Sequence, residues 1–384
     1  MQRRRGNCTM RNRALLAALM TLSVVGQDAC ATGVPLPIHG ELGRVNRQIQ
    51  GQVLDFTHNH GHDRRIWSPA LCAKRDMYVY LPPGYDPAKK YPLSIFLHGA
   101  GQDEQFFLRS IAKEFDRAIV CGDLPPFILA APDGSIMGRP SFSRSASFWA
   151  NTDAGRYEDY LMHDVWDFVM ANFSIHPERD AHALIGVSMG GAAAFTNAIK
   201  HKHRIKTAVG FMPALNLRFV DCNSHYEAPF DPDCWGYREK VHPFEVIGRP
   251  KGIFKIRFHN LFGPLVGNGP DAIIKLTRFN PIEVMEAYDL KPGELNLYAA
   301  WGGMDEFNID AQVKSFLHVA KARGVEVGTQ FDPRGRHDEA TGRRLFPGAV
   351  EWVRPLLEPY TVVRIGRPPL PPSLQAPSVR AENR

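Results

Sequence analysis

The segment ALIGVSMGGAAAF (183–195) surrounds one serine, Ser188, with glycines directly after an apolar run. Its central part, GVSMG (186–190), fits the pattern G-x-S-x-G, in which glycines permit a tight strand-to-helix turn that exposes the serine hydroxyl above the sheet. A serine hydroxyl is a weak nucleophile until a neighbouring base accepts its proton. The sequence therefore predicts a nucleophile at Ser188, provided that the chain also supplies a base and an acid.

Candidates for these two groups follow Ser188 in the chain order that such a turn requires, first the acid and then the histidine. Asp305 follows the apolar segment LNLYAAWGG (295–303), and His337 follows the next predicted strand. Both therefore lie in loops at the carboxyl ends of strands. Glu306 is the alternative acid, and Asp305 is preferred because it comes first after the glycine turn. We predict a Ser188–His337–Asp305 triad.

Acyl transfer through a serine also needs donors for the oxyanion of the tetrahedral intermediate. The backbone N–H of Met189 is one candidate, because it starts the predicted helix, where the helix dipole favours negative charge. The second donor is expected from HGAG (98–101), which follows the apolar segment LSIFL, with the N–H of Ala100 as the first choice.

Two other groups of residues have the types that bind metals. HNHGHD (58–63) holds three alternating histidines and an aspartate, a set that could hold a transition metal. It lies between two early strands, far in sequence from Ser188, and we interpret it as a polar turn. Asp231 and Asp233 lack the twelve-residue loop of a typical calcium site. We predict neither a metal nor another cofactor.

The rest of the chain alternates apolar strands with helical patterns, which indicates a sheet covered on both faces. Predicted strands occupy 51–59, 75–85, 93–101, 127–135, 182–188, 207–213, 295–303 and 325–333. Predicted helices occupy 156–173, the segment after the GVSMG turn, and 310–324. This order predicts a mainly parallel, doubly wound α/β sheet with helices on both faces.

The interval 214–280 breaks this alternation before the strand that leads to the acid, and an insert of that length is usually a lid or a substrate wall. We expect an irregular lead-in over 32–50, a catalytic domain over 51–358 that contains the insert, and a proline-rich, disordered tail over 359–384.

The first residues read as a secretory signal peptide over 1–31, with a basic start, the apolar segment 14–26 and an Ala-x-Ala cleavage pattern ending at Ala31. The protein is therefore expected to be secreted or periplasmic. Lipid attachment at Cys30 is disfavoured by the glutamine three residues before it. No run of eighteen apolar residues occurs, so stable membrane insertion is not expected.

Charge argues against a nucleic-acid partner. The net charge is +6, but +4 of it lies in 1–31 and +3 in 360–384, so the remaining chain carries −1. A chain without a basic excess in its body has little attraction for a polyanion. The hydrophobic share of 44% and the charged share of 22% are typical of a soluble globular protein.

Export also changes the interpretation of the cysteines, because disulfides form in oxidising compartments. Four cysteines follow the predicted signal peptide. Cys222 and Cys234 flank a turn-rich loop and are expected to pair. Cys72 and Cys121 form the second expected pair, with buried free thiols as the alternative.

With these motifs the chain resembles the putative esterase family of α/β-hydrolases, which includes S-formylglutathione hydrolase, feruloyl and acetylxylan esterases, enterochelin esterase and the antigen 85 mycolyltransferases. The matching segments are YVYLPPGYD (78–86), FLHGAGQDE (96–104), APDGS (131–135), GVSMGGAAAF (186–195), WGGMDEF (301–307) and GRHD (335–338). The resemblance spans about residues 50–358 and implies a Ser–Asp–His esterase without a metal. The long segment 214–280 departs from the family pattern.

The predicted function is hydrolysis of an extracytoplasmic carboxylic ester, of a small molecule or a carbohydrate, through an acyl-enzyme. Acyl transfer to an alcohol would use the same triad, and the sequence does not separate the two reactions. A non-catalytic binding protein on a hydrolase fold is disfavoured because no triad position is substituted.

Overall fold

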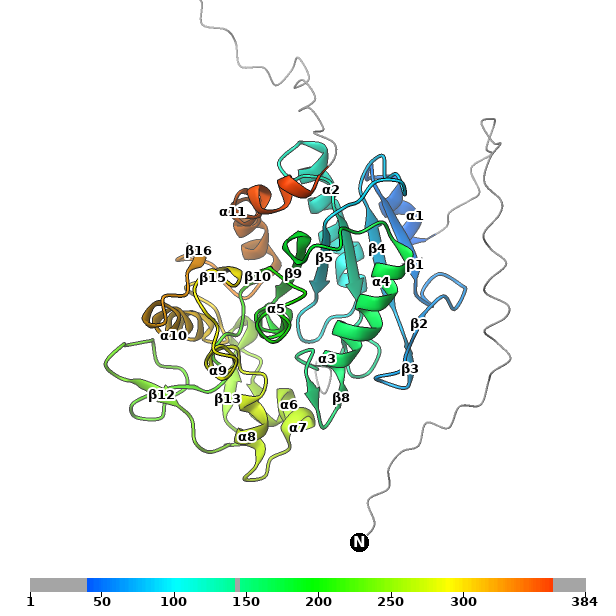
Figure 1. The fold of residues 1–384 in the computed structure, drawn as a ribbon. Helices are drawn as coiled ribbons and strands as arrows, with labels where there is room; N and C mark the ends of the chain where they lie inside the picture. Colours follow the sequence, from blue (N-terminus) through cyan, green and yellow to red (C-terminus); the bar gives the residue numbers. More distant parts are fainter. Residues whose placement is uncertain (1–39, 142–145, 362–384) are drawn as a thin grey trace, which may run out of the picture.

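The structure of the protein, a computed structural model, describes residues 40–141 and 146–361 (Figure 1). Its centre is an eight-stranded sheet with the order β1-β4-β6-β5-β9-β10-β15-β16. In that order the strands are Gln52–Phe56, Met77–Leu81, Ile128–Pro132, Leu93–Leu97, His182–Val187, Thr207–Phe211, Asn296–Gly302 and Val327–Asp332. β4 is antiparallel to β1 and β6, and all other neighbours are parallel.

The central strands form where the sequence has continuous apolar runs. Every residue of β5, β6 and β10 is buried, as expected for parallel strands that are covered on both faces. In the register of the sheet, Val209 lies opposite Ile185 on one side and Tyr298 on the other. The predicted strands and their parallel arrangement are therefore confirmed.

Helices cover both faces of this sheet. The longer ones are α2 (Ala112–Val120), α4 (Trp166–Asn172), α5 (Met189–Lys200), α9 (Pro281–Ala287), α10 (Ile309–Ala322) and α11 (Glu339–Leu357). Figure 1 shows α2 and α11 on one side of the sheet and α4, α5 and α10 on the other. This double winding confirms the predicted α/β-hydrolase fold.

The helix predicted over 156–173 is divided into three consecutive segments, α3 (Tyr157–Asp159), the π-helical η2 (Tyr160–Val165) and α4. A π turn inserts one residue into the helical register. The smaller elements are β2 (Ile66–Ser68), β3 (Ala73–Arg75), η1 (Phe107–Ile111), β7 (Asn151–Thr152), β8 (Gly155–Arg156), η3 (Arg179–Ala181) and η5 (Glu358–Tyr360).

The lead-in predicted as irregular over 32–50 is wrong in part, because Glu41–Asn46 form the helix α1. Hydrogen bonds to residues outside the helix hold this segment in place. The Asn46 side chain donates to the carbonyl of Val53 (3.0 Å) and accepts from its N–H (2.8 Å). The N–H of Gly51 donates to the Asp116 carboxylate on α2 at 2.7 Å. Contacts of this kind leave no periodic pattern in a sequence.

The insert 214–280 contains two short hairpins and three short helices. Its elements are β11 (Phe219–Asp221), β12 (Trp235–Tyr237), β13 (Val246–Gly248), η4 (Pro250–Gly252), β14 (Ile256–Arg257), α6 (Phe258–Leu261), α7 (Gly263–Val266) and α8 (Ala272–Thr277). β11 pairs with β12, and β13 pairs with β14. The insert contacts α10 through β11.

The expected Cys222–Cys234 disulfide is confirmed, with the two Cα atoms 4.8 Å apart. The expected pairing of Cys72 with Cys121 is wrong, since both are exposed and not joined by a disulfide. Cys72 lies in the β2–β3 turn and Cys121 directly follows α2, and Figure 1 places these elements well apart.

The predicted signal peptide, with Cys30, lies outside the described residues, as does most of the predicted tail. Within residues 40–141 and 146–361, no helix combines the length and apolar character needed to cross a bilayer.

Candidate active site

Ser188 occupies a sharp turn between β9 and α5, with φ 55° and ψ −116°. Positive φ is unusual for a residue with a Cβ atom, and such backbone strain is often found at functional sites. The two flanking glycines allow the turn to be this tight. A Cβ at Gly186 would lie 2.1 Å from the Gly190 carbonyl oxygen, and a Cβ at Gly190 would lie 2.0 Å from that of Leu97. The G-x-S-x-G pattern is thus required by close backbone contacts.

Three side chains form a chain of hydrogen bonds that starts at this turn. The Ser188 hydroxyl lies 2.9 Å from Nε2 of His337, and Nδ1 of His337 lies 2.7 Å from Oδ2 of Asp305. Because a carboxylate only accepts, Nδ1–H donates to Asp305 and Nε2 is left to accept from the hydroxyl. The structure brings together residues that are 149 and 32 positions apart in the sequence.

The Asp305 side chain is fully buried, and that of His337 is 16% exposed. Burial lowers the pKa of the His337 imidazole, but the Asp305 and Glu306 carboxylates more than offset this, so the pKa is raised above its ordinary value. The imidazolium form that arises when His337 accepts a proton is therefore stabilised by its surroundings.

Glu306, the alternative acid at the sequence level, contacts the backbone of the histidine loop instead of the imidazole. Its Oε2 accepts from the His337 backbone N–H at 3.0 Å, and its Oε1 accepts from the Arg336 side chain at 2.9 Å. The Phe307 ring lies against the His337 ring, with centroids 4.7 Å apart. Neighbouring residues of one loop thus orient both the backbone and the ring of His337.

The loop 303–308, which carries Asp305 and is called the acid loop below, is itself held by the insert. The Tyr226 hydroxyl donates to the Phe307 carbonyl at 2.6 Å, and the Gln312 amide donates to the same carbonyl at 3.0 Å. The Asn308 side chain, whose backbone is left-handed with φ 52°, donates to the carbonyls of Tyr226 and Ala228. Both of these residues lie inside the loop that the disulfide closes. Sequence reasoning missed this contact, because its partners are about eighty residues apart and share no local pattern.

The two predicted oxyanion donors, Met189 and Ala100, line the cavity that contains Ser188. Met189 is the first residue of α5, so its N–H has no acceptor within the helix. The N–H of Gly99 is already paired, since it donates to Oε1 of Gln102 at 2.8 Å, and Ala100 stays the predicted second donor. A Cβ at Gly99 would lie 3.4 Å from the Ser188 Cβ, so the loop passes directly beside the serine.

A cavity of about 440 Å³ opens beside Ser188 and His337, and most of its walls are apolar. The sheet and its helices contribute five phenylalanines, Phe96, Phe106, Phe115, Phe211 and Phe346. The insert contributes mainly Leu217, Ile247, Ile256, Leu261 and Phe262. The smaller polar share of the walls comes from side chains such as Gln102, Ser110, Glu114, Asn260, Glu339 and Arg343. A cavity of this composition suits an apolar group attached to the reacting carbonyl.

Comparison with protein families gives a match over residues 68–251 to the family described as "Putative esterase". The match covers a little less than half of the chain. Esterase Rv1288 of Mycobacterium tuberculosis (strain H37Rv) is 27% identical over 178 residues, which are 44% of this chain and 36% of the relative. The chain thus matches little more than a third of the length of that curated relative.

Solved structures show the same fold at low sequence identity. A ferulic acid esterase is 15% identical with a TM-score of 0.57, over 80% of this chain and 99% of that one. An S-formylglutathione hydrolase from Agrobacterium tumefaciens is also 15% identical, with a TM-score of 0.54, over 80% of this chain and 96% of that one. Both neighbours support the α/β-hydrolase fold.

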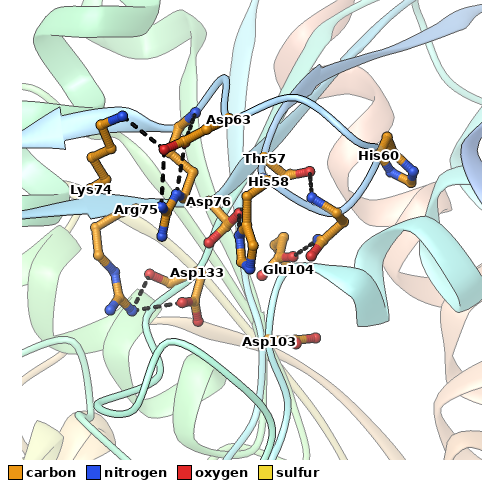
Figure 2. A network of polar contacts seen from close by, with 12 residues as sticks. Thr57, His58, His60, Asp63, Lys74, Arg75, Asp76, Asp103, Glu104 and Asp133 are labelled. Atoms are coloured by element: carbon orange, nitrogen blue, oxygen red, sulfur yellow. Dashed lines mark hydrogen bonds and ion pairs between the residues drawn. The ribbon is translucent and has the colours of Figure 1, made fainter.

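The HNHGHD turn contributes to a polar network beside β4 (Figure 2). His58 Nδ1 lies 2.7 Å from the Asp76 carboxylate, and His60 Nε2 lies 2.8 Å from the Tyr78 hydroxyl. His62 is exposed. Among the residues that the structure describes, no three histidine, cysteine or acidic side chains are arranged to hold a metal ion.

The same network reaches the loop that follows HGAG. Arg75 pairs with Asp133 at 2.7 Å, and both side chains are buried. Glu104 is 4% exposed and accepts a hydrogen bond from the Asn59 amide at 2.6 Å. Figure 2 shows Glu104 and Asp133 on the same side of the HNHGHD turn. Buried polar contacts therefore hold the segment that directly follows HGAG.

Proposed function

We propose that the protein is a serine carboxylic-ester hydrolase that acts outside the cytoplasm through an acyl-enzyme. The observation that carries this proposal is the hydrogen-bond chain from Ser188 through His337 to Asp305, which starts at a strained turn beside an apolar cavity. The match of residues 68–251 to an esterase family supports the reaction class.

In the first half of the reaction, the Ser188 hydroxyl oxygen attacks the ester carbonyl carbon while Nε2 of His337 accepts the hydroxyl proton. Asp305 stabilises the imidazolium by accepting from its Nδ1–H. The backbone N–H groups of Met189 and Ala100 stabilise the oxyanion of the tetrahedral intermediate. The carbonyl re-forms when the bond to the alcohol oxygen breaks, and His337 returns the proton to that oxygen.

In the second half, a water molecule attacks the acyl carbon of the ester on Ser188, with His337 again accepting the proton. The second tetrahedral intermediate collapses, the bond to Ser188 Oγ breaks, and the serine regains its proton from His337. The products are a carboxylic acid and the free enzyme, so the cycle needs no metal or cofactor.

The substrate is proposed to be an acyl ester of a small molecule or a carbohydrate. The apolar cavity favours a hydrocarbon or aromatic acyl group over a charged one, because a buried charge without a partner is costly. The disulfide supports a site outside the cytoplasm, where disulfides persist.

The test is hydrolysis of p-nitrophenyl butyrate by the purified protein in the presence of EDTA, with labelling by a fluorophosphonate probe. Ser188→Ala is expected to lower kcat by roughly four to six orders of magnitude and to abolish labelling. Ser110→Ala is the matched control, because Ser110 lines the same cavity without a predicted role. A folded Ser188→Ala variant with full activity would refute the nucleophile, and activity lost in EDTA and restored by zinc would refute the metal-free mechanism.

The other two triad residues should differ in a defined way. His337→Ala is expected to cost about as much as Ser188→Ala, because the hydroxyl is nearly inert without a base. Asp305→Asn should leave somewhat more activity. The double variant Ser188→Ala/His337→Ala should be little worse than either single variant, since residues that act as a unit are not additive.

A further inference from the structure

The insert presents the most exposed apolar side chains in the described part of the chain. Ile253, Phe244, Ile274 and Phe254 are 75%, 72%, 63% and 58% exposed, more than any other large hydrophobic residue there. Three of the four belong to the β13–β14 hairpin or its immediate flank. Single exposed apolar residues are common on proteins, but several on one short hairpin indicate an interaction surface.

The same hairpin is basic. Residues 249–257 contain four lysines and arginines and no acidic residue. Arg249 pairs with Glu227 at 2.9 Å, and the Arg257 guanidinium lies 6.0 Å from the centre of the Phe244 ring. Lys255 is exposed and forms no ion pair with any residue that the structure describes. Exposed apolar residues interspersed with cations are typical of segments that bind the surface of anionic membranes.

The hairpin also borders the cavity that contains Ser188. Ile247, Pro250 and Ile256 line this cavity, whereas Ile253 and Phe254 project into solvent from the turn between the two strands. A surface that receives the hairpin would therefore lie close to the substrate cavity.

We propose that the β13–β14 hairpin docks on an anionic lipid surface and brings an acyl ester held in that surface to the cavity. Ile253 and Phe254 would enter the boundary between headgroups and acyl chains, while Lys255 and Arg257 remain with the anionic headgroups. The binding is peripheral and needs no membrane-spanning helix. The part that concerns the substrate rests on the proposed esterase function, whereas the docking part does not.

Flotation with lipid vesicles tests the docking directly. The full protein is expected to bind phosphatidylcholine vesicles that contain about one third phosphatidylglycerol, more weakly as salt rises, and to bind pure phosphatidylcholine poorly. Lys255→Glu removes a cation and adds an anion, so vesicle affinity should fall roughly 25-fold, at about fivefold per unit charge. Lys90→Glu, in an exposed loop, is the matched control and should change affinity little.

The apolar contribution is tested with the double variant Ile253→Ser/Phe254→Ser, which should lose vesicle binding, and with Trp67→Ser as the control for an exposed aromatic residue outside the insert. Both variants should hydrolyse soluble p-nitrophenyl butyrate at the native rate. Hydrolysis of an ester carried in anionic vesicles should fall only in the hairpin variant.

Equal binding of the native protein and the hairpin variants to anionic vesicles, or no binding by either, would overturn the proposal. So would self-association of the native protein that the hairpin variant abolishes, because the surface would then serve a second copy of the chain. Vesicle binding without any ester hydrolysis would refute the proposed function and leave the docking surface intact.

Discussion

Glu104 is a buried carboxyl group three residues after the HGAG segment, and its replacement by glutamine should make the protein more stable at neutral pH. Burial first, and then the nearby carboxylates of Asp133, Asp103 and Asp76, raise the pKa of Glu104 to about 9. The folded protein therefore keeps this group protonated at pH 7, whereas the unfolded chain releases the proton.

The size of the effect follows from this difference in pKa. The ordinary pKa is 4.5, so between about pH 4.5 and 9 the folded state binds more protons at this site than the unfolded state. The free energy of unfolding then falls as pH rises, by about 1 kcal/mol per pH unit or slightly more. At pH 7 the free energy of unfolding is therefore about 3 kcal/mol lower than it would be without this titration. Glu104→Gln keeps an oxygen to accept from Asn59 and removes the titration.

The assay is urea unfolding of the native protein and of Glu104→Gln at a series of pH values from 5 to 8. The variant should be more stable by about 3 kcal/mol at pH 7, and the difference should shrink towards zero near pH 4.5. Taking the difference cancels the groups that titrate equally in both proteins. Glu326→Gln, at an exposed position, is the matched control and should give a small difference. A difference for Glu104→Gln that stays constant with pH, or grows as pH falls, would refute the reasoning.

Further predictions concern the site. Asp305→Asn should shift the acid limb of the pH profile of kcat/KM to lower pH, because the carboxylate raises the pKa of His337; an unmoved limb would contradict this. Replacing both cysteines of the insert disulfide with serine should lower the free energy of unfolding by about 2–4 kcal/mol. The same change should lower kcat several-fold, because the acid loop is then held less firmly; an unchanged kcat would refute that link. Gly190→Ala should destabilise the protein by about 3 kcal/mol or more, whereas Gly236→Ala, where a Cβ meets no atom within 4 Å, should be tolerated. Glycerol added to the assay should distinguish hydrolysis from acyl transfer, since only a transferase yields mainly the glycerol ester.

The sheet could be predicted from the sequence because its signal is local. A parallel strand covered on both faces must be apolar at every position, and segments such as Leu93–Leu97 satisfy this without reference to the rest of the chain. The same logic locates Asp305 and His337, because the fold gathers the loops that follow its strands at one edge of the sheet. Their catalytic roles stay predictions until the variants are measured.

The features that the sequence did not disclose depend on long-range contacts. The helix α1 is held by Asn46 and by the Gly51–Asp116 hydrogen bond, and neither leaves a periodic pattern. The expected second disulfide was wrong because an even number of cysteines says nothing about their distance. The position of Glu306 beside the acid could have indicated a supporting role, but no neighbouring residue pointed to the contact between Tyr226 and the acid loop.

The insert lines the substrate cavity and, through Tyr226, also holds the loop that carries the acid. A change in the insert therefore affects both the shape of the cavity and the position of Asp305. Grafting the insert of a relative with another preference would change the cavity wall and would also remove the hydrogen bonds to Phe307 and Asn308. Directed evolution of specificity should therefore begin with cavity residues whose side chains form no hydrogen bond with the acid loop, such as Leu261 and Phe346.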